Sequence, residues 1–188
     1  WFLVLTLLAI LWRNRKYGDA VIAKYYLPAL QLRFLGAVLS ACMYHFYYGG
    51  GDTMTYYKVG KGMYNAFTID PLMWLEMVFS SLDHYSSETR AYMFDLAYDV
   101  REDDMHQGST GFVSSTAGFF SIFTFNSYLA NSFIITTFAF LGNWKIYKVF
   151  YNLYPNLHKQ LAFAILFVPS VFFWGTGVMK DPIVLGAL

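Results

Sequence analysis

The chain has 188 residues, of which 57% are hydrophobic, 21% aromatic and only 13% charged, with a net charge of +1. Soluble domains are usually about 25% charged, so this composition indicates a membrane protein and offers no basic surface of the kind that binds nucleic acid. The single cysteine, Cys42, excludes a disulfide framework and a cysteine-rich zinc site.

Apolar runs separated by charged segments predict an all-α, polytopic membrane protein with about four to five spanning helices. The first run, residues 1–12, is too short to cross a bilayer alone, because a span needs about 20 residues. The chain begins with Trp1 and ends with Leu188, each inside an apolar run. We therefore expect a single transmembrane domain over residues 1–188, cut from a longer protein, with an outer loop over residues 49–110.

The second run, residues 27–48, is long enough to span the membrane. Arg33 lies near its cytoplasmic end, where we expect the long side chain to reach the membrane surface. Tyr44, Tyr47 and Tyr48 lie at the opposite end and predict an aromatic belt at the outer interface.

The outer loop contains segments with helical patterns. Residues 71–79 are apolar almost all round and follow a capping residue, Asp70, which predicts an interfacial or re-entrant helix. Residues 87–100 mix charged and apolar side chains and predict an amphipathic helix. Residues 101–106 concentrate carboxylates with one histidine, which could hold a divalent cation or form a solvated acidic loop. The cofactor is therefore left unknown.

The second half of the chain contains two more predicted spans. Residues 108–125 interleave small and aromatic side chains and predict a short helix that lies along the membrane or enters it. Residues 127–144 predict the third span, and residues 160–174 predict a fourth that is bent or interrupted at Pro169. A further apolar run begins at residue 183.

Basic residues are concentrated in the segments assigned to the inner side of the membrane. These segments hold Arg13, Arg15, Lys16, Lys24, Arg33, Lys145, Lys148 and Lys159, and their only acidic residue is Asp19. Cytoplasmic segments of membrane proteins are enriched in Lys and Arg. The distribution therefore predicts that the long loop faces outward.

The stretch that organises the functional interpretation is residues 47–57, YYGGGDTMTYY. Three glycines allow a sharp backbone turn, and Asp52 is the first carboxylate after it. Asp52 is interpreted either as part of a helix start or as a catalytic or binding carboxylate, and both roles can coexist. Tyr56 and Tyr57 follow it and are candidate substrate-binding residues.

Lys180 and Asp181 form a second candidate group, because they also fall at the outer end of a predicted span. Charges at the membrane edge are costly, which makes them functional hypotheses. We expect Lys180 to hold an anionic phosphate, with Asp181 orienting the lysine or helping to hold a metal. The alternative is that the two form an ion pair at the start of the next helix. Asp52, Lys180 and Asp181 are expected to face one outer cavity.

Residues 47–57, together with residues 168–181 (VPSVFFWGTGVMKD), resemble segments of polytopic bacterial membrane proteins, notably from Bacteroidota. Those proteins are similar to GT-C glycosyltransferases. The resemblance implies a multi-pass protein of the bacterial inner membrane, a polyprenyl-phosphate sugar donor, and Asp52 as the catalytic base. The roles given to Lys180 and Asp181 come from their chemistry and position.

The sequence therefore predicts a membrane glycosyltransferase that works on the outer face of the inner membrane and contacts the bilayer and a lipid-linked sugar donor. The alternative is a non-catalytic accessory or structural subunit of a multi-protein membrane complex, whose aromatic-rich outer loop packs on partner subunits. A transporter is a third alternative, because Pro169 and the glycines at 175 and 177 interrupt a predicted span.

Overall fold

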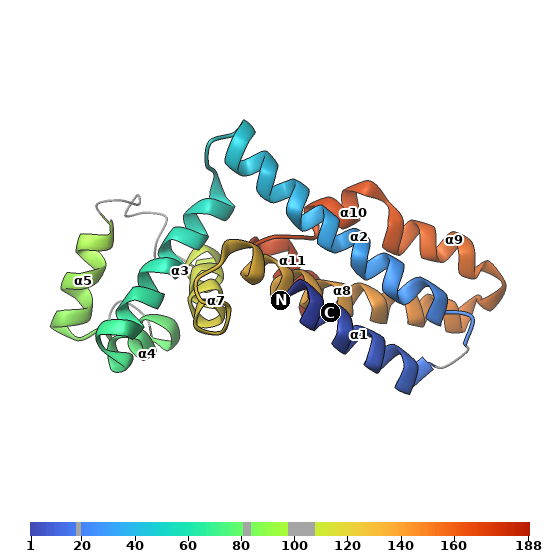
Figure 1. The fold of residues 1–188 in the computed structure, drawn as a ribbon, viewed down its shortest axis with the longest axis horizontal. Helices are drawn as coiled ribbons and strands as arrows, with labels where there is room; N and C mark the ends of the chain where they lie inside the picture. The colour runs from blue at the N-terminus through green and yellow to red at the C-terminus, as the bar shows by residue number, and fades with distance from the viewer. Residues whose placement is uncertain (18–19, 81–83, 98–107) are drawn as a thin grey trace. The chain divides into compact units, whose positions relative to one another are not determined.

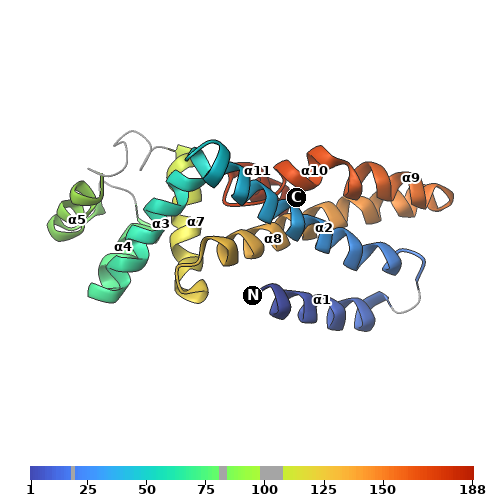
Figure 2. The same ribbon diagram turned by 45° about the horizontal axis from the view of Figure 1, so that its top comes forward.

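The computed structural model describes residues 1–17, 20–80, 84–97 and 108–188, and it is built from helices (Figures 1 and 2). Of this structure 86% is helical, and the described residues include no strand. The predicted all-α class is confirmed. Asp19 and the acidic stretch 101–106 lie outside the described residues.

The helical elements follow one another through short turns. They are α1 (Phe2–Tyr17), α2 (Ala23–Cys42), the π-helical η1 (Met43–Tyr47), α3 (Asp52–Ile69), α4 (Pro71–Phe79), α5 (Ser87–Ala97), α7 (Gly108–Thr124), α8 (Tyr128–Leu153), η3 (Pro155–Leu157), α9 (His158–Ala162), the π-helical η4 (Phe163–Phe167), α10 (Pro169–Trp174) and α11 (Lys180–Ala187).

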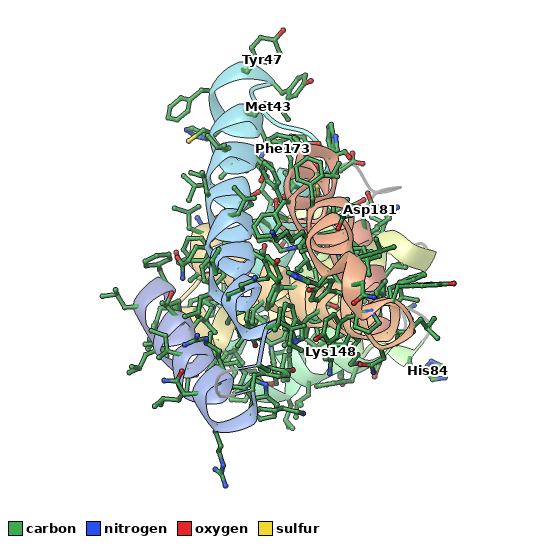
Figure 3. The ribbon with its side chains drawn as sticks, turned by 90° about the vertical axis from the view of Figure 1, so that its right-hand side faces the viewer. Met43, Tyr47, His84, Lys148, Phe173 and Asp181 are labelled. Atoms are coloured by element: carbon green, nitrogen blue, oxygen red, sulfur yellow. The ribbon has the colours of Figure 1, made fainter. Side chains whose placement is uncertain are left out.

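One segment among the described residues, Ala23–Tyr47, is long and apolar enough to cross a membrane. It joins α2 to η1, has 25 residues and a mean hydropathy of 1.3, and corresponds to the predicted second span. Half of its most apolar window is buried inside the structure. Figure 3 shows Tyr47 at the tip of this helix, one turn beyond Met43.

The other predicted spans also coincide with helices, although their bounds differ from the prediction. The third forms α8, which continues to Leu153, so Lys145 and Lys148 lie inside the helix. The fourth is divided into α9, η4 and α10. The break falls at Val168, whose extended backbone precedes Pro169. Proline lacks an amide hydrogen and disfavours helical geometry in the residue before it, which accounts for the break.

The chain divides into two compact units. Unit 1 comprises Trp1–Met43, Ser132–Gly177 and Asp181–Leu188, and unit 2 comprises Tyr44–Asn131 and Val178–Lys180. The single transmembrane domain stays a prediction.

Unit 1 is a bundle with an aromatic core. The buried residues of this core are Ala9, Ile22, Tyr26, Ala29, Leu30, Phe34, Phe140, Trp144, Tyr147, Ala162 and Leu166. Tyr26 lies edge-on to Trp144, with ring centroids 4.9 Å apart, so α2 and α8 share this core. Gly36 lets α10 approach α2, because a Cβ atom there would lie 2.4 Å from the carbonyl oxygen of Phe172.

The position of Arg33 corrects the sequence prediction, in which its side chain reached the membrane surface. Arg33 is fully buried in unit 1, and its Nη1 donates a hydrogen bond to the carbonyl oxygen of Gly175 at 3.0 Å. Its Nε and Nη2 have no hydrogen-bond partner within the described parts of the chain. The prediction placed Arg33 by its distance along one helix, whereas α10 packs on α2 and covers it.

Unit 2 is formed by α3 packed along α7, with α4 and α5 beside them. Its buried core residues are Val59, Met63, Ala66, Trp74, Met77, Tyr85 and Met93. The predicted cap of α4 is confirmed, because the Oδ1 atom of Asp70 accepts a hydrogen bond from the Leu72 amide at 2.9 Å. The predicted amphipathic helix over residues 87–100 is present as α5, with residues 98–100 outside the described structure.

Candidate functional site

The three glycines before α3 make the sharp turn that the sequence predicts. Gly49, Gly50 and Gly51 all have positive φ angles, of 64°, 156° and 110°. The Gly50 amide donates to the carbonyl oxygen of Tyr44 at 3.0 Å, which closes the turn onto the end of η1. A Cβ atom on Gly51 would lie 3.0 Å from the ring of Tyr44. Larger residues in this turn would therefore be strained.

Asp52 is the first residue of α3 and is exposed to solvent. The residue that caps the helix is Gly51, and a carboxylate in the first turn is favoured by the helix dipole. Asp52 also lines a pocket of about 430 Å³ together with Tyr44, Tyr48, Gly50 and Gly51. The carboxylate therefore contributes to the helix start and remains accessible for chemistry in an aromatic pocket.

Lys180 belongs to the same unit as Asp52 and is held against α3. Its Nζ atom donates to the Oγ1 atom of Thr110 at 3.3 Å and lies 5.8 Å from the ring centroid of Tyr56. Tyr56 is buried and lies four residues after Asp52, on the same face of α3. Because a helix rises about 6 Å over four residues, Tyr56 and its lysine contact lie about one turn along α3 from Asp52. Lys180 is not among the residues that line the Asp52 pocket.

The face of α3 beside this site is anchored to the turn between α7 and α8. The Tyr57 hydroxyl donates to the carbonyl oxygen of Asn126 at 2.7 Å, and the Thr53 and Tyr128 hydroxyls are 2.8 Å apart. Burial raises the pKa of Tyr57 above its ordinary 10.0, so its hydroxyl stays protonated and able to donate. Tyr57 therefore positions the start of α3, while Tyr56 supports Lys180.

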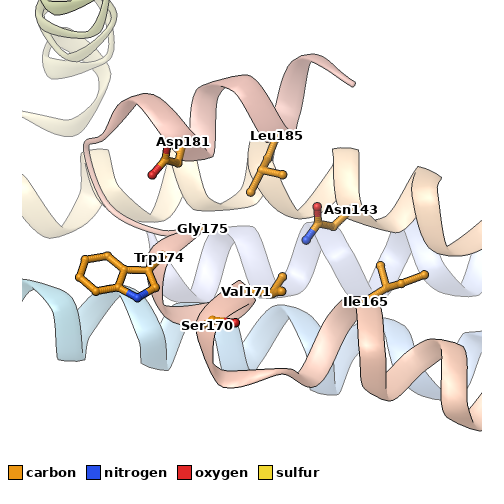
Figure 4. Close-up of a pocket in the computed structure, with 8 residues that line it drawn as sticks. All are labelled: Asn143, Ile165, Ser170, Val171, Trp174, Gly175, Asp181 and Leu185. Atoms are coloured by element: carbon orange, nitrogen blue, oxygen red, sulfur yellow. The ribbon is translucent and has the colours of Figure 1, made fainter.

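Asp181, predicted beside Lys180 in one cavity, belongs to unit 1 and is exposed. It lines a pocket of about 260 Å³ with Asn143, Ser170, Trp174 and Gly175, among others, as Figure 4 shows. The contacts of the neighbouring Lys180 are with Thr110 and Tyr56 of unit 2. The two adjacent charges thus belong to different units.

The described residues contain no group of three or more His, Cys, Asp or Glu side chains that could hold a metal ion. The acidic stretch 101–106, which the sequence analysis considered as a possible cation site, lies outside the described residues. The described residues of the candidate site are accordingly one carboxylate, one ammonium group and aromatic rings.

Sequence reasoning missed the residues that build this site from other elements. Tyr44 was interpreted only as part of an aromatic belt, and Thr110 and Asn126 carried no signal at all. Tyr44 contributes a ring, Thr110 a hydroxyl and Asn126 a backbone carbonyl group. Single groups of this kind form no sequence motif, so they cannot be recognised from the order of residues. The left-handed turn at Phe125 and Asn126, with φ of 50° and 57°, is equally unmarked by glycine.

The chain was compared with protein families, curated proteins and solved structures, and none of these comparisons finds a match.

Proposed function

We propose that this chain belongs to a polytopic membrane glycosyltransferase of the GT-C type, which transfers a sugar from a polyprenyl-phosphate donor on the outer face of the bacterial inner membrane. The observation that carries the proposal is the exposed Asp52 carboxylate in an aromatic pocket, with Lys180 held over the adjacent turn of the same helix. This pairs a proton acceptor with a cation suited to a phosphate.

The surface of unit 1 supports the membrane location. Helix α1 exposes a row of apolar side chains, including Leu3, Leu7 and Leu11, whose exposed fractions are 76%, 58% and 58%. Leu35 and Leu39 on α2 are also about half exposed, at 52% and 47%. Soluble proteins seldom expose contiguous apolar surface of this kind. Lipid chains would cover it.

The proposed reaction uses the two charged groups in complementary roles. The acceptor hydroxyl gives its proton to the Asp52 carboxylate as its oxygen forms a bond to the anomeric carbon of the sugar. The bond between that carbon and the phosphate oxygen breaks, and the electron pair leaves with the phosphate. The Lys180 ammonium stabilises the charge of the departing polyprenyl phosphate. The rings of Tyr44 and Tyr48 form the walls of the pocket that holds the reactants.

Replacement of the proposed base tests the reaction. We expect Asp52→Asn to lower sugar transfer by about 10²- to 10⁴-fold, because an amide cannot accept the proton. The protein level in membranes should not change, since Asp52 is exposed and the cap of α3 is the backbone of Gly51. The measurement is the glycan and glycoprotein profile of cells that carry each variant as their only copy.

The matched control is Asp95→Asn, which makes the same change at an exposed aspartate on α5. It should leave the profile intact. A normal profile in Asp52→Asn cells would remove Asp52 from the reaction and with it the glycosyltransferase proposal.

An accessory subunit remains the second candidate, supported by the apolar surface of α4. Leu72, Leu75 and Phe79 are exposed on this short helix, by 68%, 43% and 67%. A partner subunit could cover them. This candidate predicts fixed partners that co-purify with both the wild type and Asp52→Asn but are lost when residues 71–79 carry Leu72→Ser, Leu75→Ser and Phe79→Ser. A single species after gentle extraction would contradict it.

A further inference from the structure

One end of unit 1 gathers basic side chains from three separate segments. In Figures 1 and 2 the end of α1, the start of α2 and the turn from α8 to α9 lie at the same end of the bundle. These segments carry Arg13, Arg15, Lys16, Lys24 and Lys159, and Lys145 and Lys148 lie in the second half of α8. The described residues of unit 1 include a single side-chain carboxylate, Asp181, and it lies on α11.

Within this basic end, three groups from α2 and α9 are tied together by direct contacts. The Tyr25 hydroxyl and the Nδ1 atom of His158 are 2.7 Å apart, and the Lys24 Nζ lies 5.0 Å from the Tyr25 ring centroid. The Tyr147 hydroxyl donates to the carbonyl oxygen of His158 at 3.3 Å. Lys24 and the neighbouring Lys159 are exposed. The contacts hold the imidazole in place and leave both ammonium groups facing solvent.

The charges of Lys24 and Lys159 both act on the imidazole of His158. Desolvation is the larger cause that lowers the pKa of His158 below its ordinary 6.5, and the charges of Lys24 and Lys159 lower it further. The two lysine charges disfavour a further positive charge on His158, so a bound anion would reduce the repulsion among these groups. Lysine is a common phosphate-binding residue in proteins, where it acts as a point charge.

Exposed apolar side chains border the same cluster. Leu153 and Leu157, just before His158, are 64% and 45% exposed, and Val21, just before Lys24, is 46% exposed. A soluble phosphate compound would gain nothing from these side chains. A phospholipid matches both features, because it carries acyl chains next to a charged headgroup.

We propose that Lys24, His158 and Lys159 form a binding site for the phosphate headgroup of an anionic phospholipid, whose acyl chains lie along Leu153 and Leu157. The proposal rests on the membrane location that is part of the proposed function, but not on glycosyl transfer. The lipid bound here is a structural component of the bundle and is distinct from the sugar donor, whose proposed site is built from unit 2.

Lipid binding can be measured directly by native mass spectrometry of the full chain in detergent, titrated with dioleoyl phosphatidylglycerol or dioleoyl phosphatidylcholine. We expect the wild type to bind the anionic lipid more tightly. Since each lysine near an anionic surface contributes about a fivefold change in affinity, Lys24→Gln with Lys159→Gln should weaken phosphatidylglycerol binding about 30-fold. Binding of phosphatidylcholine should not change.

The matched control is Lys58→Gln with Lys61→Gln, which removes two exposed lysines from α3 in unit 2. Its affinity for phosphatidylglycerol should equal that of the wild type. The proposal is overturned if the wild type binds both lipids equally, or if the control loses as much affinity as the Lys24 and Lys159 variant. It is also overturned if millimolar inorganic phosphate displaces the lipid completely, since the site would then serve a free anion.

The failure of this proposal is distinguishable from failure of the glycosyltransferase proposal. Asp52→Asn should retain phosphatidylglycerol binding while losing sugar transfer, because Asp52 is not part of the basic cluster. Equal binding of the two lipids by the wild type would therefore contradict only the lipid site. A normal glycan profile in Asp52→Asn cells would contradict only the role of Asp52 in sugar transfer.

Discussion

At the scale of single residues, the burial of Arg33 has a large energetic cost. A guanidinium that stays charged is removed from water, and one carbonyl oxygen, that of Gly175, accepts a hydrogen bond from it. Burying a charge without an ionic partner costs several kcal/mol. In a membrane protein of the proposed kind, a buried charge of this sort is a functional hypothesis, and the hydrogen bond of Arg33 connects it to the turn at Gly175.

Replacing this arginine by an apolar side chain of similar length should not destabilise the bundle. We expect Arg33→Met to have an unfolding free energy equal to that of the wild type or higher by about 1–3 kcal/mol, because the cost of desolvating the guanidinium disappears. The measurement is thermal unfolding in detergent, followed by circular dichroism. Arg15→Met, at the exposed end of α1, is the control and should leave the melting temperature unchanged.

A marked fall in the melting temperature of Arg33→Met would contradict this expectation. It would mean that the guanidinium has a stabilising partner other than Gly175. The same variant also separates stability from activity, since a bundle that is more stable but inactive would identify Arg33 as a functional residue.

At the scale of elements, Glu76 connects α4 to the start of α5. Its Oε2 atom accepts hydrogen bonds from the Thr89 hydroxyl at 2.6 Å, the Ser86 hydroxyl at 2.9 Å and the Ser86 amide at 3.0 Å. The Ser86 hydroxyl also accepts a hydrogen bond from the Thr89 amide at 3.2 Å, which caps α5. These bonds to the carboxylate hold its pKa below the ordinary 4.5, with the Thr89 hydroxyl contributing most.

The lowered pKa of Glu76 predicts a pH dependence of stability. Because the folded protein favours the ionised form, the stabilisation is fully present above the pKa of the unfolded chain, near 4.5, and is lost as the pH falls through the lower folded value. Glu76→Gln should therefore be less stable than the wild type at neutral pH, and the difference should shrink as the pH falls below 4.5. Chemical unfolding measured at several pH values tests this.

The control for the pH series is Glu88→Gln, which makes the same change on an exposed side chain of α5. Its stability at neutral pH should equal that of the wild type. A difference between Glu76→Gln and the wild type that stays the same at every pH of the series would show that the charge of Glu76 is not what joins the two helices.

The contact between α3 and α7 depends on a close approach at Gly60. A Cβ atom there would lie 2.9 Å from both the Cβ of Ala117 and the amide nitrogen of Gly118. Gly62, two residues further along α3, has the end of the Leu96 side chain as its nearest neighbour. A flexible side chain can rotate away from an added methyl group, whereas a helix backbone cannot. We therefore expect Gly62 to accept an alanine more readily than Gly60.

This difference predicts the outcome of two identical substitutions. Gly60→Ala should destabilise the protein by about 1–3 kcal/mol, because α7 has to shift. Gly62→Ala should be close to neutral, because the gain in helix propensity of about 1 kcal/mol offsets a rotation of Leu96. Thermal or chemical unfolding of both variants is the measurement. Equal effects at the two sites would mean that α7 is not packed against Gly60.

At the scale of the whole molecule, the chain forms two units of different character. Unit 1 exposes apolar side chains along α1 and α2 and basic side chains at one end, a distribution that matches lipid chains and lipid headgroups. Unit 2 contains the glycine turn, Asp52 and Lys180, and its core is built from the helices of the segment predicted as an outer loop. The residues of the proposed membrane contact therefore belong to unit 1, and those of the proposed reaction belong to unit 2.

The sequence by itself determined the features that depend on neighbours along the chain. The capped start of α4, the turn at residues 49–51, the break at Pro169 and the helix in the predicted second span all follow from local backbone preferences and hydrophobic patterning. These preferences act over one to five residues and leave a recognisable signature in the order of residue types.

Only the tertiary structure decided which distant side chains meet. It buried Arg33 beneath α10, attached Lys180 to Thr110 and Tyr56, and assigned Asp181 to the other unit. It also brought the Tyr25 hydroxyl to His158, which lies 133 residues later in the chain, and so placed Lys24 near that histidine. The physical reason is that such contacts are selected by the packing of whole helices, in which one small residue, such as Gly36 or Gly60, sets how closely two surfaces approach.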